Sequence, residues 1–314
     1  MSTVSNKVLV LFGPTACGKT ELLSRLFAPD ARALPRPGVV VSADSIQVYR
    51  GLDLGSAKPD GRLLSLLPHE LLDIRDPRES FSVADFVELA DESCARACSA
   101  GALPVVSGGT AYYIKAFLMG VPPAPRSDPA VRAAIQRDMD ERGLDALRAE
   151  LEAVDPESAA RIAPADAYRI ARALEVYRGS GRPLSSFAPS AEPRGRWDTL
   201  VIGMDRPRDI LYARIDARVD AMVAAGLRDE VRRLVAAGYG PGDPGMRGIG
   251  YAEFLAAVES GDAAAIVADI KKHTRQYAKR QLTFMRALPG VRWFDMEDPP
   301  SFDAIRSAVT AWLG

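Results

Sequence analysis

The sequence is poor in cysteine and contains no long apolar run. Its three cysteines, Cys17, Cys94 and Cys98, are too few and too irregularly placed for a disulfide framework, which fits a reducing compartment. Cys94 and Cys98 have no second cysteine pair or histidine nearby, which argues against a metal site. No segment approaches the roughly 20 apolar residues of a membrane span, and the N-terminus lacks a basic and apolar signal region. We therefore expect a cytoplasmic protein without a membrane partner.

Net charge is also almost absent, because 40 lysine and arginine residues face 41 aspartate and glutamate residues, which leaves −1. A polyanionic ligand would therefore bind to a local basic patch rather than to a uniformly basic surface. The 314 residues are 47% hydrophobic and 26% charged, as expected for a globular protein with a sizeable core. This length predicts one large domain, or one domain that carries an insertion.

A phosphate-binding pattern stands near the start of the chain. Residues 8–12 are an apolar run typical of a strand buried on both faces, and helix-forming residues follow from Glu21. Strand, glycine-rich loop and helix are the context in which a G-x-x-x-x-G-K-T loop binds phosphate. The loop is complete and predicts a polyphosphate site formed by Gly13, Pro14, Thr15, Ala16, Cys17, Gly18, Lys19 and Thr20.

Each fixed position of this loop has a physical role. Gly13 and Gly18 let the backbone bend so that successive N–H groups point at one anion, and the following helix adds its positive N-terminal end. Lys19 supplies a point charge, and Thr20 can hold Mg²⁺, the one cofactor that we expect. The pattern indicates a bound polyphosphate and does not specify ATP.

Three further apolar runs are typical of buried strands and lie at residues 38–42, 103–107 and 200–204, and a final strand is predicted at residues 291–294. Strands and helices alternate through residue 120, which predicts an α/β fold with a P-loop-type, mostly parallel sheet flanked by helices. In such sheets, residues just past the carboxyl ends of strands line the ligand crevice. This rule places Asp44, Gln47 and the turn at residues 108–110 beside the phosphate loop.

The middle of the chain has a different character. Prolines at residues 122–125 form a stiff connection, and residues 129–177 are rich in Ala, Arg, Glu and Leu, which predicts helices only. Helix starts are expected at Asp155-Pro156 and at Ala163-Pro164. We expect a helical insertion domain at residues 122–195, inserted into a P-loop catalytic core formed by residues 1–121 and 196–314. One long helix is predicted after the insertion, over residues 207–237.

A basic helix is predicted near the end of the chain, at residues 263–287. Its residues 271–286 include six lysines or arginines and no acid, a pattern that usually marks a solvated surface. Residue types that commonly contact nucleic acids are interleaved with these charges: Gln276, Tyr277, Gln281 and Thr283. The alternative is therefore a footprint for a phosphate backbone. Arg169 and Arg172 also share one helix face, where ion pairs with Asp166 or Glu175 are the alternative.

Together these motifs resemble the tRNA dimethylallyltransferases, also called tRNA isopentenyltransferases. The matching runs follow the family's order over nearly the whole chain, at residues 13–20, 42–51, 55–59, 108–110, 172–176, 247–251 and 274–281. Three residues depart from the family pattern: Cys17 stands where serine is common, Tyr168 where glutamine is common, and Phe284 where tryptophan is common.

The resemblance implies transfer of a dimethylallyl group from dimethylallyl diphosphate to N6 of adenosine 37 in the tRNA anticodon stem-loop. The loop at residues 13–20 would then hold the diphosphate, and the insertion would contact tRNA. We expect a monomer. The tRNA-binding residues are expected to be Asp44, Ser45, Ile46, Gln47, Thr110, Arg132, Tyr168, Arg169, Arg172, Arg275, Lys279 and Arg280.

This reaction needs charge neutralisation on the departing diphosphate and a base for the attacking amine. Lys19, Thr20 with Mg²⁺ and, by the family match, Arg247 are expected to meet the first need. Asp44 follows a strand beside the loop and is the predicted general base. An acid that organises Mg²⁺, or a helix N-cap, is the alternative role of Asp44.

Simpler roles also exist for several other polar residues. Thr110 could cap the helix after the glycine pair, and Arg132 could form a surface ion pair. His69 is expected to be a hydrogen-bonded structural histidine. His273 lies in the basic helix and is expected to be a backbone contact or a surface group.

Three other functions are compatible with the loop. A small-molecule kinase would show an arginine-rich lid and a nucleotide-base pocket for ATP. An adenylate isopentenyltransferase would modify free AMP and would not need the basic helix. A non-enzymatic, ATP-gated RNA-binding module is the third.

Overall fold

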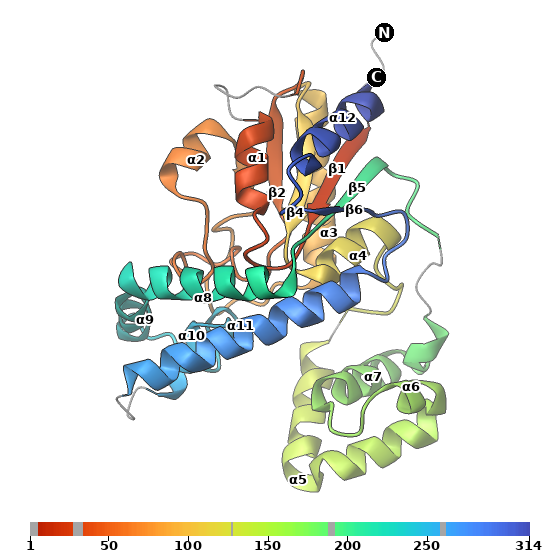
Figure 1. The fold of residues 1–314 in the computed structure, drawn as a ribbon. Coiled ribbons are helices and arrows are strands. Elements are labelled where there is room, and N and C mark those ends of the chain that lie inside the picture. The colour runs from red at the N-terminus through yellow and green to blue at the C-terminus, as the bar shows by residue number, and fades with distance from the viewer. Residues whose placement is uncertain (1–5, 28–33, 127, 188–191, 258–261) are drawn as a thin grey trace. The chain divides into compact units, whose positions relative to one another are not determined.

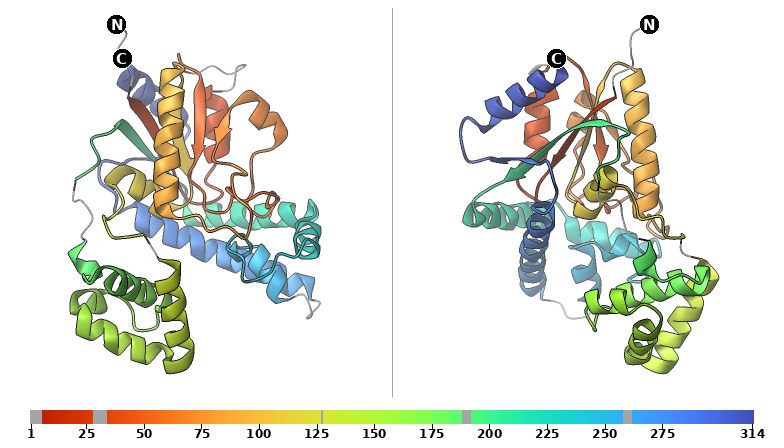
Figure 2. Two further views of the ribbon diagram at one scale, coloured as in Figure 1. Left: turned by 180° about the vertical axis from the view of Figure 1, so that it is seen from behind. Right: turned by 90° about the vertical axis from the view of Figure 1, so that its right-hand side faces the viewer.

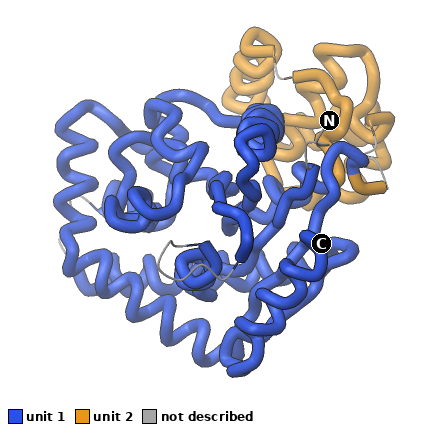
Figure 3. Tube along the Cα trace, turned by 90° about the horizontal axis from the view of Figure 1, so that it is seen from above, with its two compact units in different colours: residues 1–118, 194–314 blue, residues 119–193 orange. Residues whose placement is uncertain are grey.

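The computed structural model describes residues 6–27, 34–126, 128–187, 192–257 and 262–314. It has two compact units, Met1–Leu118 with Arg194–Gly314 and Met119–Pro193 (Figure 3). The boundaries of the smaller unit are close to those of the predicted insertion, residues 122–195. In the described part of the chain, no helix is both long enough and apolar enough to cross a membrane.

The larger unit is built on a parallel six-stranded sheet with the order β3-β2-β4-β1-β5-β6 (Figure 1). Its strands are β1 (Lys7–Phe12), β2 (Gly38–Ser42), β3 (His69–Glu70), β4 (Leu103–Gly108), β5 (Asp198–Asp205) and β6 (Arg292–Asp295). The predicted fold class is confirmed. Because β1 pairs with β4 on one side and β5 on the other, the phosphate loop leaves from the middle of the sheet.

Helices cover both faces of this sheet (Figure 2). On one face, α1 (Lys19–Phe27) and α12 (Ser301–Leu313) share a buried core with β1. This core includes Leu9 and Leu11 of β1, Leu22 of α1 and Ile305 of α12. On the other face lie α3 (Val83–Ser99) and α4 (Ala111–Met119), joined by the stacked rings of Phe86 and Tyr113 at 4.5 Å. The short helix α2 (Gly61–Leu66) precedes β3. Cover on both faces explains the unbroken apolar runs of the central strands.

A further group of helices lies beyond the carboxyl ends of the strands: α8 (Arg208–Ala224), α9 (Leu227–Ala236), α10 (Tyr251–Ala256) and α11 (Ala263–Met285) (Figure 1). The prediction of one helix over residues 207–237 is wrong, because the chain turns at Gly226. Its φ of 101° is left-handed, a conformation that glycine adopts without strain. The helices α8 and α11 pack against each other across the edge where the strands end.

A buried carboxylate anchors the loop after β2 to this group of helices. Glu230 of α9 accepts hydrogen bonds from the N–H groups of Leu54 at 2.9 Å and Gly55 at 3.3 Å, and from the Tyr251 hydroxyl at 2.6 Å. The Lys58 ammonium is also buried and donates to the carboxylate of Asp53 at 2.8 Å. These bonds hold the intervening segment, including Ser56, at the carboxyl edge of the sheet.

The smaller unit consists of helices α5 (Pro129–Val154), α6 (Pro156–Arg161) and α7 (Ala167–Ser180), followed by a 3-10 turn at Leu184–Ser186. The predicted helix start at Asp155-Pro156 is confirmed, with the Asp155 carboxylate accepting from the Ser158 N–H at 3.0 Å. The start predicted at Ala163-Pro164 is wrong. Helix α7 begins instead at Ala167, because the carboxylate of Asp166 caps its first turn.

Gly108→Ala is expected to destabilise the protein, because an added Cβ would lie 2.1 Å from the carbonyl oxygen of Ala43. Relief requires movement of paired backbone, so the free energy of unfolding should fall by about 1–3 kcal/mol. Urea unfolding followed by circular dichroism measures this. Gly179→Ala in α7 is the control, since a Cβ there meets no atom within 4 Å and should not destabilise. Equal stability of the two variants would contradict the close approach.

Candidate active site

The loop between β1 and α1 presents a row of backbone amides. Gly18 is left-handed with φ 103°, and Ala16 has a φ of 63°. Among the described residues, the N–H groups of Ala16, Gly18, Lys19 and Thr20 donate no hydrogen bond to the protein. Successive free amides at a helix N-terminus form an anion-binding concavity. The Lys19 ammonium lies over this loop and donates to the carbonyl oxygens of Gly13 and Pro14, each at 2.9 Å.

Two arginines that sequence reasoning missed donate hydrogen bonds to carbonyl oxygens of this loop. Arg206, just past β5, donates through Nε to the Cys17 carbonyl at 2.9 Å and is also paired with Glu297. Arg214 of α8 donates through Nε to the Ala16 carbonyl at 2.9 Å. Burial, with the nearby Arg214, lowers the pKa of Arg206. Because both arginines bind loop carbonyls, they hold the amides of the loop facing the other way.

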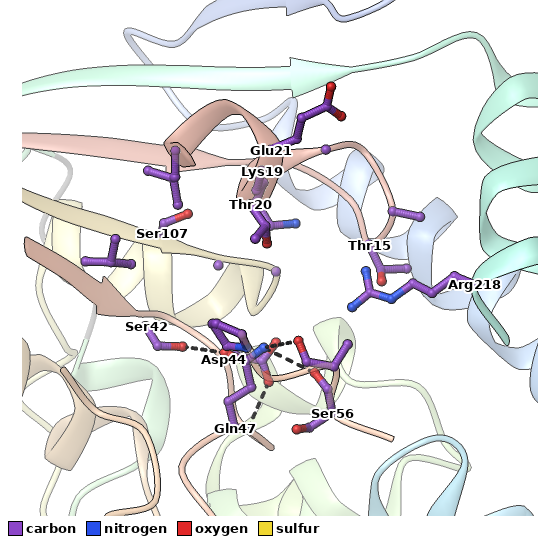
Figure 4. A pocket seen from close by; sticks show the side chains of 18 of the residues that line it. Thr15, Lys19, Thr20, Glu21, Ser42, Asp44, Gln47, Ser56, Ser107 and Arg218 are labelled. Atoms are coloured by element: carbon purple, nitrogen blue, oxygen red, sulfur yellow. Dashed lines mark hydrogen bonds between the residues drawn. The ribbon is translucent and has the colours of Figure 1, made fainter. Parts of the chain in front are cut away.

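A cavity of about 570 Å³ opens at this loop (Figure 4). Its walls come from the phosphate loop, from the ends of β2 and β4, and from α8 and α11. Lys19, Thr20 and Asp44 all line it, so the predicted loop and the predicted base face one space. The carboxyl-edge rule for parallel sheets explains this convergence, since residues far apart in the sequence end at the same edge.

Asp44 presents one oxygen to the backbone and leaves the other for the cavity. Its Oδ1 accepts hydrogen bonds from the N–H groups of Ile46 at 2.9 Å and Gln47 at 3.3 Å. These bonds stabilise a turn rather than a helix, so the alternative of a helix N-cap does not apply. Within the described residues, no hydrogen bond or ion pair occupies Oδ2. The carboxylate is therefore oriented by the backbone and retains an acceptor for a proton.

Arg218 is the most informative residue that sequence reasoning missed. It reaches from α8 into the space between Thr15 and Asp44 (Figure 4). In the described part of the chain its guanidinium makes no hydrogen bond and no ion pair within 4.0 Å. Burial lowers the pKa of Arg218, and the Asp44 carboxylate opposes this effect. A half-buried guanidinium without a partner is suited to an anionic ligand. The only sequence signal was its spacing of four residues from Arg214 on one helix.

A second cavity, of about 320 Å³, adjoins the first. Five residues line both cavities: Thr15, Asp44, Ser56, Arg218 and Tyr277. The second cavity has an apolar wall that includes Ile46, Ile215, Val219, Met222, Leu227, Ile249 and Ile270. Burial and the Asp44 charge raise the pKa of Tyr277 to about 12, so its hydroxyl stays protonated at neutral pH. The boundary between the two cavities thus runs beside one carboxylate and one guanidinium.

Of the other predicted site residues, Ser45, Ile46 and Arg247 line the second cavity, whereas Gln47 lines the first. Ser45 and Ile46 line the second cavity, and Ser45 donates its N–H to the Thr110 hydroxyl at 3.0 Å. The Gln47 amide accepts from Ser42 and donates to the carbonyl oxygens of residues 56 and 57, at 3.1 and 3.3 Å. Gln47 would have to break these bonds to contact a base. Arg247 lines the second cavity and donates to the Gly242 carbonyl at 3.1 Å.

The predicted basic residues fall into paired and unpaired groups. Arg275 contacts Asp216 at 2.5 Å, whereas Lys279 and Arg280 of α11 are exposed without an ion pair among the described residues. Arg280 also lines the second cavity. In the smaller unit, Tyr168 is 80% exposed. Three arginines of this unit form the ion pairs that are the alternative to a tRNA contact. Arg169 pairs with Asp166, and Arg132 and Arg172 both pair with Glu175.

The two histidines have protein partners. His69 lines the first cavity, and its Nδ1 lies 2.7 Å from the Leu67 carbonyl oxygen, as expected for a structural histidine. Burial lowers the pKa of His69, so the ring is neutral at pH 7. His273 contacts the Glu253 carboxylate at 2.7 Å and its side chain is partly exposed, as expected for a surface group, whereas a contact with a nucleic-acid backbone stays a prediction.

A magnesium ion fits this donor set without a protein cage. The described residues contain no cluster of three histidine, cysteine or acidic side chains. Mg²⁺ commonly uses one or two protein oxygens together with substrate phosphates and water. The Thr20 hydroxyl lines the first cavity beside the free amides, which is the position such an ion would need.

The fold and the site define a P-loop-type α/β protein with a carboxylate and an arginine facing the loop. The family model for IPP transferase matches residues 47–288, and the chain belongs to this family. It is 43% identical over 309 residues to tRNA dimethylallyltransferase 1 of Trichlorobacter lovleyi, covering 98% of this chain and 99% of that relative. The tRNA dimethylallyltransferase of Geobacter sulfurreducens is 42% identical over 315 residues, covering 98% and 97%.

Solved structures agree with this assignment. The tRNA isopentenylpyrophosphate transferase of Bacillus halodurans superposes with a TM-score of 0.69 at 34% identity, covering 98% of this chain and 97% of that one. A eukaryotic dimethylallyltransferase described as acting on tRNA gives a TM-score of 0.77 at 24% identity, covering 97% and 78%. The second match concerns the fold alone.

Arg218→Met is expected to weaken the binding of pyrophosphate, because it removes an unpartnered charge that faces the loop. A hydrogen bond to a charged group contributes about 1.5–3 kcal/mol, so Kd should rise about tenfold to a hundredfold. Isothermal titration calorimetry measures the change. Arg228→Met, on the exposed face of α9, is the control and should bind as the parent does. Unchanged affinity in Arg218→Met would remove Arg218 from the anion site.

Proposed function

We propose that the protein is a cytoplasmic enzyme that transfers a dimethylallyl group from dimethylallyl diphosphate to N6 of adenosine 37 in tRNA. Family membership supports the reaction class. The observation that carries the proposal is the shared boundary of the two cavities, where Asp44 and Arg218 lie beside the phosphate loop. A leaving diphosphate and the attacking amine of an adenine can meet there.

The phosphate loop is suited to a diphosphate leaving group. When the C1–O bond of the donor breaks, its electron pair stays on the diphosphate, which gains negative charge. The free amides, the Lys19 ammonium and the Arg218 guanidinium are preorganised to stabilise this charge. Thr20 would hold Mg²⁺, which neutralises diphosphate oxygens when it is bound. No third phosphate is needed for this chemistry.

Asp44 is suited to remove the proton of the attacking amine. The N6 amine of adenine is a weak nucleophile, so its proton must leave as the new N–C1 bond forms. Asp44 has one oxygen fixed by the Ile46 and Gln47 amides and one oxygen without a partner. A general base typically contributes about 10²–10⁴-fold to the rate.

The acceptor adenine must leave the stacked anticodon loop to reach this boundary, at a cost of about a few kcal/mol. The second cavity, with Ser45, Ile46 and Arg280 in its lining, is the space that we assign to the flipped base. Exposed Lys279 and Arg280 would contact the phosphate backbone next to it. The smaller unit, with Tyr168, Arg169 and Arg172, would contact the anticodon stem-loop elsewhere.

The experiment that tests this function is incubation with labelled dimethylallyl diphosphate and either unmodified tRNA or free AMP. We expect label in tRNA and little in AMP. Label in AMP alone would indicate an adenylate isopentenyltransferase. Consumption of ATP with a small-molecule acceptor, without prenyl transfer, would indicate a kinase.

Asp44→Asn is expected to lower kcat for tRNA prenylation about 10²–10⁴-fold, because the amide cannot accept the amine proton. Binding of pyrophosphate and tRNA should not weaken, since Asn can keep the bonds to the backbone amides. Single-turnover transfer and calorimetry measure the two effects. Asp209→Asn, at an exposed position of α8, is the control. A fully active Asp44→Asn enzyme would rule out the base.

Lys279→Gln is expected to weaken tRNA binding and to reduce its salt dependence. Each phosphate contact releases about one counterion, so the slope of log Kd against log salt should fall by about one. Arg62→Gln, on the exposed helix α2, should leave the slope unchanged. Filter binding at several salt concentrations measures both. An unchanged slope in Lys279→Gln would exclude a phosphate contact there.

A further inference from the structure

One amide of the phosphate loop, that of Thr15, has a side-chain partner, and that partner comes from the basic helix. The Thr15 N–H donates to Oε1 of Gln281 at 3.0 Å. Gln281 of α11 is 3% exposed, and its Nε2 donates to the Gly109 carbonyl at 2.6 Å. A single buried side chain therefore bridges the phosphate loop and the glycine turn after β4.

The position of this bond divides the loop into two parts. Ala16, Gly18, Lys19 and Thr20 keep free N–H groups and line only the first cavity. Thr15 lies at the other edge of the loop, where the two cavities meet beside Asp44. At that edge the loop offers an oxygen acceptor, the Gln281 carbonyl, in place of an N–H donor. An anion is attracted to the first part and repelled by the oxygen at the second.

We propose that Gln281 is a positioning residue that confines the bound anion to two phosphates and sets their register on the loop. This inference rests on the proposed function, because the two phosphates are those of the prenyl donor. A third phosphate extending toward Thr15 would meet the Gln281 oxygen, so triphosphates are disfavoured. The edge beside Asp44 stays available for the reacting carbon of the donor. Discrimination here uses an unfavourable contact against the wrong ligand, a common source of specificity.

The surroundings of Gln281 hold it in this role. Gly109 has no side chain, and a Cβ there would lie 2.6 Å from Nε2 of Gln281. Tyr277, one helical turn before Gln281, places its hydroxyl 3.4 Å from the same Gly109 carbonyl. The amide therefore has one orientation, with its oxygen on Thr15 and its nitrogen on Gly109, and it cannot turn its N–H₂ group toward the anion without losing both bonds.

The test compares pyrophosphate with tripolyphosphate in Gln281→Met, which keeps the side-chain volume and removes both hydrogen bonds. Freeing the Thr15 N–H adds one donor to the edge of the loop. The ratio of the two dissociation constants should shift about tenfold in favour of tripolyphosphate, the size of one hydrogen bond to a charged group. Calorimetry at fixed magnesium concentration measures the ratio. Gln276→Met, the same change at an exposed site of the same helix, should leave it unchanged.

Transfer kinetics give a second readout that a purely structural role would not produce. In Gln281→Met the donor diphosphate can shift by one amide, which moves its reacting carbon relative to Asp44. We expect kcat to fall at least tenfold while KM for dimethylallyl diphosphate changes less than threefold, because small misplacements of reacting atoms cost large factors in rate. Equal changes in both constants would contradict control of register.

Gly109→Ala provides an independent route to the same effect, since the added methyl group displaces the Gln281 amide. If thermal melting shows that the Gln281→Met protein does not fold, the Gly109→Ala protein is used for the same comparison of dissociation constants. A shifted ratio in either folded variant supports the inference, and an unchanged ratio in a folded Gln281→Met protein overturns it. The ratio is measured without prenyl transfer. If the parent protein does not prenylate tRNA and the ratio still shifts in the variant, the proposed function is rejected and the role of Gln281 is retained.

Discussion

Free backbone amides at the end of β1 are the feature on which the rest of the site depends. They exist because the loop from Gly13 to Thr20 turns through left-handed residues and enters α1 with the N–H groups of Ala16, Gly18, Lys19 and Thr20 unpaired among the described residues. Arg206 and Arg214 bind the carbonyl side of this loop and thereby keep the amide side open to the cavity. Backbone N–H dipoles held in this way are suited to an anionic ligand.

The parallel sheet brings the remaining chemistry to these amides. Asp44 follows β2, Gly109 follows β4, and Arg206 follows β5, so each reaches the same edge although the chain separates them widely. The helices α8 and α11 then cross that edge and supply Arg218 and Gln281. Glu230 fixes the loop that carries Ser56 through buried hydrogen bonds. These bonds fix one wall of the two cavities, which Ser56 lines.

The sequence predicts the parts of this arrangement that depend on local patterns. Continuous apolar runs predicted β1, β2, β4 and β5, the segment at residues 291–294 predicted β6, and the glycine-rich loop predicted an anion site. Asp44 could be placed by the carboxyl-edge rule alone. The two-residue strand β3 left no such pattern, and the break at Gly226 was hidden within a continuous helical sequence.

Arg218 and Gln281 could not be assigned from local patterns, because their roles arise from the crossing of α8 and α11 over the sheet edge. In sequence, Arg218 looks like any arginine on an amphipathic helix, and Gln281 looks like one polar residue in a basic run. Only the tertiary structure shows that Arg218 has no hydrogen bond or ion pair among the described residues and that Gln281 accepts a hydrogen bond from the Thr15 N–H. The arginines at 132, 169 and 172 form ion pairs with acidic side chains, which is the alternative that the sequence had left open for them.

The proposed reaction requires that the phosphate loop hold the diphosphate of the donor as a leaving group. Product inhibition is a direct test, because released pyrophosphate would return to the same amides. Pyrophosphate is expected to compete with dimethylallyl diphosphate and not with tRNA. Inhibition that added dimethylallyl diphosphate cannot relieve, or a requirement for ATP in the transfer, would contradict it.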